Sequence, residues 1–97
     1  MPVIKCRGIT YFSQLDEKMF FASLHQIAAV KKVEGSGSAL LLEVTSRPSD
    51  KSLRELTGLF FRYRVDMEPL AVFLNKKNQL WFFDPKRYWF KKVFRKQ

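Results

Sequence analysis

The sequence predicts a single small α+β domain, and three observations lead to this class. The chain has 97 residues, of which 46% are hydrophobic, a share that suits one compact core and is too high for a disordered chain. Short runs of apolar and strand-forming residues indicate β-strands, and two runs with apolar residues three or four positions apart indicate helices. The predicted order is β-α-β-β-α-β-β-α, with the helices packed on an antiparallel sheet.

A strand and a helix open the predicted fold. Residues 3–12 alternate as a half-buried strand does. Ser13 stands three positions before Asp16, which is the spacing of a helix N-cap followed by an acidic first turn. We expect the helix to cover residues 14–28.

A β-hairpin is predicted next. Residues 29–34 and 39–45 have strand character and enclose the turn Gly35–Ser38. The first strand carries Lys31 and Lys32, as strands at the edge of a sheet often do. The two glycines suit a tight turn and lack the spacing of a phosphate-binding loop.

A second helix is predicted to run from a serine cap, Ser49 or Ser52, to about Val65. Phe61 lies on its polar side, beside arginines, so we expect either the end of the chain or a second subunit to cover it. One face of this helix is apolar and should pack on the sheet; it consists of Leu53, Leu56, Leu59, Phe60 and Tyr63.

Two more strands and a last helix complete the prediction. Residues 70–74 and 79–83 have strand character and enclose a turn rich in Asn and Lys. Asp84 can cap a helix that begins at Pro85, so a basic, aromatic helix is expected over residues 85–96. The first six elements follow the ferredoxin-like split β-α-β order, which by itself says little about function.

The net charge of +9 is concentrated near the end of the chain. Residues 1–75 contain ten basic and eight acidic residues, whereas residues 76–97 contain eight basic residues and Asp84 alone on the acidic side. A local positive field of this kind suits an acidic partner, such as nucleic acid or an anionic membrane surface. The candidates for binding a polyanion are Lys76, Lys77, Lys86, Arg87, Lys91, Lys92, Arg95 and Lys96.

The residue inventory argues against catalysis. Cys6 is the only cysteine and His25 the only histidine, so we expect no disulfide, no metal site and no nucleophile–histidine pair. The chain also lacks the glycine-rich motifs that bind nucleotide cofactors. We therefore expect a non-enzymatic protein without a cofactor. The single cysteine and the absence of a signal peptide or an apolar membrane span favour the cytoplasm.

Three interpretations of the aromatic side of the last helix remain open. Its rings can pack against the sheet, they can lie between two subunits, or they can bind nucleic acid or lipid directly. We expect an interaction domain that forms a homodimer through an aromatic surface. A binder of nucleic acid or another polyanion, without sequence specificity, is the alternative, and a small-molecule binder or enzyme is a third hypothesis. The interface candidates are Phe61, Trp81, Trp89, Phe90 and Phe94.

Overall fold

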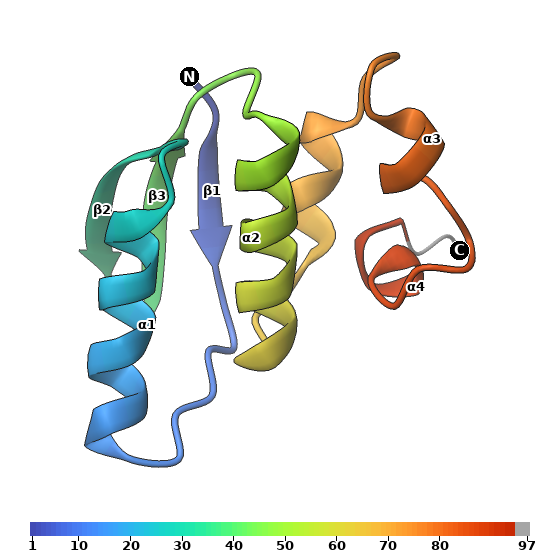
Figure 1. Cartoon of the computed structure of the whole chain (residues 1–97). Coiled ribbons are helices and arrows are strands. Elements are labelled where there is room, and N and C mark those ends of the chain that lie inside the picture. The colour runs from blue at the N-terminus through green and yellow to red at the C-terminus, as the bar shows by residue number, and fades with distance from the viewer. Residues whose placement is uncertain (95–97) are drawn as a thin grey trace.

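A three-stranded antiparallel sheet forms one layer of the protein (Figure 1). The structure is a computed structural model that describes residues 1–94. The strands are β1 (Val3–Cys6), β2 (Val30–Ser36) and β3 (Ala39–Val44), in the order β1-β3-β2. The predicted hairpin is confirmed, and β2 lies at an edge of the sheet as its lysines indicated.

The strand β1 is shorter than the sequence predicted. Ile4 and Cys6 are buried, whereas Val3 and Lys5 are exposed, so only one face of the strand meets the core. The prediction of a strand over residues 3–12 is wrong beyond Cys6, because the chain leaves the sheet. The backbone carbonyl of Arg7 accepts a hydrogen bond from the Asp66 N–H at 3.0 Å.

The first helix, α1 (Gln14–Gln26), confirms the prediction to within two residues. The Ser13 Oγ accepts a hydrogen bond from the Asp16 backbone N–H at 3.2 Å, which satisfies one of the free N–H groups at the helix start. Phe20 and Leu24 are fully buried. They fix α1 against the rest of the core.

The second helix, α2 (Asp50–Arg62), is capped by Ser49, whose Oγ accepts a hydrogen bond from the Ser52 N–H at 3.1 Å. Arg64 follows the helix with a φ of 60°, in the left-handed region. The Val65 N–H donates to the Phe60 carbonyl at 2.9 Å. This is the hydrogen bond of a Schellman C-cap that spans six residues. The buried residues of α2 include the predicted Leu53, Leu56, Leu59 and Phe60.

The prediction of two strands after α2, over residues 70–74 and 79–83, is wrong, because both segments are helical. The first forms the 3-10 helix η1 (Glu68–Phe73), and the second forms the single helical turn α3 (Gln79–Phe82). Asn78 holds the loop between them: its Nδ2 donates to the Phe73 carbonyl and its Oδ1 accepts from the Asn75 N–H, at 2.8 and 2.9 Å. These bonds close a loop where a hairpin was expected. The ferredoxin-like order therefore ends after five elements, and the α+β class is confirmed.

The last helix, α4 (Phe90–Val93), is a single turn and is much shorter than the expected helix over residues 85–96. Turns precede it. The Asp84 Oδ1 accepts a hydrogen bond from the Lys86 N–H at 3.0 Å, and the Asp84 carbonyl accepts one from the Arg87 N–H at 3.0 Å. Asp84 therefore stabilises a turn rather than capping a long helix. The predicted sites Arg95 and Lys96 lie outside the described residues.

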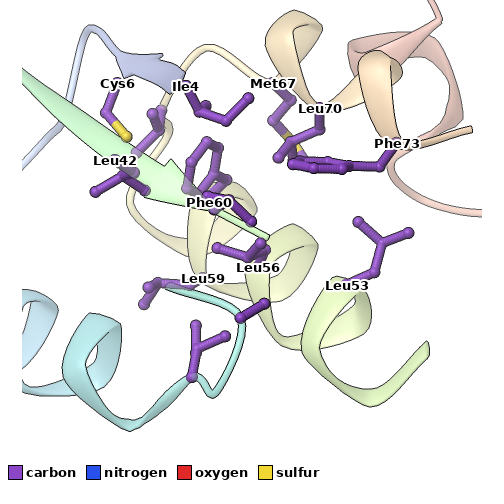
Figure 2. Close-up of a cluster of buried hydrophobic side chains, with 14 of the residues drawn as sticks. Ile4, Cys6, Leu42, Leu53, Leu56, Leu59, Phe60, Met67, Leu70 and Phe73 are labelled. Atoms are coloured by element: carbon purple, nitrogen blue, oxygen red, sulfur yellow. The ribbon is translucent and has the colours of Figure 1, made fainter. Parts of the chain in front are cut away.

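The core joins the sheet to the C-terminal helices through α2 (Figure 2). Ile4 and Leu42 occupy paired positions on β1 and β3. Phe60 belongs to the same buried cluster as these strand residues and as Leu70 and Phe73 of η1. Because α2 packs against both the sheet and the C-terminal helices, a movement of the sheet would disturb the packing of those helices, and the reverse also holds.

Candidate functional site

Seven aromatic rings of the described chain form a cluster around α3 and α4, with ring centroids 4.8 to 6.3 Å apart between neighbours. Trp89 is only 3% exposed, and its Nε1–H donates to the Phe82 carbonyl at 2.8 Å. Trp89 is therefore buried by its own chain and is not accessible to a partner in this conformation. We call these rings the aromatic cluster: Trp81, Phe82, Phe83, Tyr88, Trp89, Phe90 and Phe94.

The other interface candidates are partly accessible. Trp81, Phe90 and Phe94 are half-buried within the cluster. The Arg54 guanidinium of α2 lies 4.1 Å from the centroid of the Trp81 ring. This is a cation–π contact that joins α2 to α3. These three aromatic residues thus contribute mainly to packing within the chain.

Phe61 is the candidate that remains most open. Its side chain is 41% exposed, and its ring lies 4.7 Å from the ring of Tyr88 in an edge-to-face arrangement. The Lys92 Nζ lies 5.8 Å from the centroid of the Phe61 ring. The segment before and within α4 therefore covers Phe61 in part. Of the two predicted covers, the end of the chain and a second subunit, the structure shows the first in part.

The predicted basic residues do not gather at one place. Lys76 and Lys77 line a hollow of about 440 Å³ together with Arg47 and Asp50, beside the start of α2. Lys92 lies beside the end of α2. The remaining described candidates lie on the segment between α3 and α4 or on α4 itself: Lys86, Arg87 and Lys91.

Most of these cations are free of ionic partners within the described chain. Arg87 is the exception, because its Nε lies 3.6 Å from the Asp84 Oδ2. The described lysines among the candidates are all exposed, and within residues 1–94 none of them forms an ion pair. They are Lys76, Lys77, Lys86, Lys91 and Lys92. Exposed, unpaired cations keep their full charge available to a ligand.

Two hollows flank Phe61 at the end of α2. The first, of about 490 Å³, lies between Phe61 and Tyr88, and the second, of about 360 Å³, lies between Phe61 and Lys92. Phe61 and Arg64 line both hollows, and no carboxylate from residues 1–94 lines either. We call this the Phe61 surface; it comprises Gly58, Phe60, Phe61, Arg62, Arg64, Val65, Met67, Tyr88 and Lys92.

Sequence reasoning found only part of the Phe61 surface. The unusual position of Phe61 beside Arg62 was visible in the helical pattern, and Lys92 belonged to the basic segment. Arg64 and Tyr88 were missed. Their meeting at Phe61 depends on how the turns after α3 fold back on α2, and periodicity carries no signal for such a contact.

Another hollow, of about 620 Å³, lies between α1 and α2. Its charged lining residues are Lys51, Arg54, Glu55 and Arg62. A single carboxylate among three cations does not provide a pair of acid and base groups with different proton affinities, which general acid–base catalysis uses. His25 is exposed on α1 and does not line this hollow.

Cys6 and Asp16, two other titratable groups considered from the sequence, have roles in the packing and hydrogen bonding of the fold. Burial raises the pKa of the Cys6 thiol to about 12, so the nucleophilic thiolate is scarce at neutral pH. The Asp16 Oδ2 accepts a hydrogen bond from the Phe12 N–H at 2.8 Å. Among residues 1–94 no three His, Cys, Asp or Glu side chains come close enough together to hold a metal ion.

No known protein family, no curated protein and no solved structure matches this chain. Within residues 1–94, no helix has the length and apolar character needed to cross a membrane.

Proposed function

We propose that this protein is a non-enzymatic binding domain whose basic C-terminal region holds an acidic polymer, with nucleic acid as the principal class. One observation carries the proposal: the lysines of this region that lie within residues 1–94 are exposed and form no ion pair there. Cys6 is the single cysteine and is a free thiol, which suits a reducing compartment, so we place this activity in the cytoplasm.

Phosphate contacts would supply most of the affinity. Each lysine that neutralises a phosphate releases condensed counterions, so binding to duplex DNA weakens as salt rises. The chain offers no recognisable element for reading base edges, and the expected binding is independent of sequence. The spread of the lysines along the C-terminal region suits an extended ligand better than a compact one.

The test is fluorescence anisotropy with a labelled DNA duplex of arbitrary sequence at several salt concentrations. The double variant Lys86→Gln/Lys91→Gln should bind at least about tenfold more weakly and should lower the salt slope by about two. The variant Lys31→Gln/Lys32→Gln is the matched control, because it removes the same charge from the sheet edge at β2. Absence of binding by the wild-type protein at low salt, both to this duplex and to single-stranded oligonucleotides, would contradict the proposal.

A second candidate, self-association, is favoured by the exposure of apolar residues near the aromatic cluster. Leu80 on α3 is 89% exposed, and Phe83 and Phe61 are also exposed. An apolar patch of this kind is often covered by a second copy. Sedimentation velocity should then report a dimer that Leu80→Ser weakens. A wild-type protein that stays monomeric at all concentrations would rule this candidate out.

A further inference from the structure

We infer that the Phe61 surface binds the bases of single-stranded nucleic acid, with the phosphate between two neighbouring nucleotides held at Arg64. This inference rests on the proposed function, because it names the form of polyanion that the basic region takes. It adds a site that the charge asymmetry of the sequence does not specify.

Exposed aromatic rings are the first line of support. Phe61 and Tyr88 are 41% and 51% exposed, although their rings contact each other and the Tyr88 ring also packs on Trp89, with centroids 4.9 Å apart. A ring on the polar side of a helix gains little from its own burial when so much of it meets water. Exposed aromatic side chains among cations are the platforms on which single-stranded nucleic acid stacks its bases, and stacking tolerates any base.

The position of Arg64 is the second line of support. It lines the hollow beside Tyr88 and also the hollow beside Lys92, with Phe61 between them. A strand whose successive bases enter the two hollows would carry its linking phosphate past Arg64, the cationic residue that lines both hollows. An arginine there can donate two parallel hydrogen bonds to the phosphate oxygens.

The charge around the site is uniformly positive. Arg62, Arg64 and Lys92 form no ion pair with a described carboxylate, and no carboxylate lines the hollows. The Lys92 Nζ stands 5.8 Å from the centre of the Phe61 ring. A base stacked near Phe61 would therefore have a cation within reach of its own phosphate.

The backbone at Arg64 has a structural cause, the C-cap of α2, and it provides a way to test the site. Its φ of 60° lies in the left-handed region, which costs an L-residue stability and which glycine adopts freely. The Arg64 guanidinium lies 5.8 Å from the centroid of the exposed Phe12 ring. This distance is near the limit of a cation–π contact and both groups meet solvent, so the contact offsets only part of the backbone strain.

A single strand fits these observations better than a duplex. The bases of a duplex are stacked on one another, so their faces are not available to Phe61 or Tyr88. The cations would also attract an anionic membrane. A site that binds through charge alone would hold an oligomer with bases and an oligomer without bases equally well. That difference is the basis of the test.

The experiment compares two labelled probes by fluorescence anisotropy: a short oligothymidylate and an abasic oligomer with the same number of phosphates. The wild-type protein should bind the oligothymidylate about tenfold more tightly, the effect of one stacked base. Phe61→Ala and Tyr88→Ala should each reduce this ratio towards one. The control Lys31→Gln should leave the ratio unchanged, because β2 lies outside the site.

Arg64→Gly separates binding from folding. Glycine relieves the left-handed backbone, so the variant should have a melting temperature at least equal to that of the wild type. It should nevertheless bind both probes several-fold more weakly, and Arg64→Lys should restore part of the affinity. If Phe61→Ala fails to fold, Arg64→Gly and Tyr88→Ala still test the site.

The outcomes distinguish the site from the broader proposal. Equal affinity of the wild-type protein for the two probes would overturn the Phe61 site and leave the basic surface intact as a polyanion binder. No binding of either probe at low salt would contradict the proposed function itself. Tighter, Phe61-dependent binding to phosphatidylserine vesicles than to oligothymidylate would overturn the inference in favour of a lipid surface.

Discussion

The sheet region, residues 3–62, and the C-terminal region, residues 68–94, achieve their packing in different ways. The sheet region buries mainly aliphatic side chains, such as Leu42 and Leu56, between strands and two helices of thirteen residues each. The C-terminal region packs aromatic rings around helices of four to six residues. The comparison teaches that backbone hydrogen-bond ladders organise the first region, whereas individual side chains organise the second.

The largest expected effect concerns Trp89. Trp89→Ala removes a buried ring from the aromatic cluster and the hydrogen bond to the Phe82 carbonyl. We expect a loss of about 3–5 kcal/mol in the free energy of unfolding, measured by urea denaturation followed by circular dichroism. Phe83→Ala, which removes a more exposed ring of the same cluster, is the control and should cost less. Equal losses for the two variants would show that the cluster is not organised around Trp89.

A smaller effect is expected at Asn78, which tests whether side-chain hydrogen bonds hold the loop between η1 and α3. Asn78→Ala leaves the buried Phe73 carbonyl and the Asn75 N–H without their partners. The expected cost is about 1–3 kcal/mol in the same denaturation experiment. Asn75→Ala is the matched control: its Oδ1 accepts hydrogen bonds from the Lys77 and Asn78 N–H groups, but Asn75 is exposed and water can replace it. A cost at Asn78 no larger than at Asn75 would argue against this account.

The third effect belongs to the sheet region and is absent at neutral pH, because it appears only at high pH. Burial raises the pKa of the Cys6 thiol from 9.0 to about 12, so the folded state holds this proton more strongly than the unfolded state. The stability that the protonated thiol contributes is complete below pH 9 and is lost as the pH rises towards 12.

Denaturation of the wild type and of Cys6→Ala across this pH range measures the difference. The wild type should lose more stability than the variant as the pH rises. Burial also raises the pKa of Tyr11, and this group should leave a pH dependence of the same sign in both proteins. Parallel pH profiles for the two proteins would contradict a buried Cys6.

The two regions also differ in how well the sequence predicts them. Ser13 and Ser49 cap the helices that they were expected to precede, and the apolar face of α2 packs inward, because a long amphipathic helix repeats its signal over several turns. The apolar run 70–74 is too short to separate a strand from a buried helix. Asn78 tolerates a hairpin turn but here binds the Phe73 carbonyl, a choice that depends on tertiary contacts.

The candidate site follows the same division. Positive charge at the end of the chain and the odd position of Phe61 were evident from residue types and helical spacing. The approach of Tyr88 and Lys92 to Phe61 was not, because these residues come from the turns after α3 and from α4. A prediction of this site would require the path of those turns in space.

The central place of β3 in the sheet has a consequence for the time course of folding. The first strand of the chain, β1, pairs with β3, whose residues are synthesised after α1 and β2, so Ile4 must wait for Leu42. The hairpin of β2 and β3 has only a short turn to close and can form before β1 pairs with β3. Trp89 and Val93 are the last buried residues of the described core to be synthesised. The apolar core positions that Trp89 and Val93 cover therefore stay exposed in a nascent chain until this segment has been synthesised.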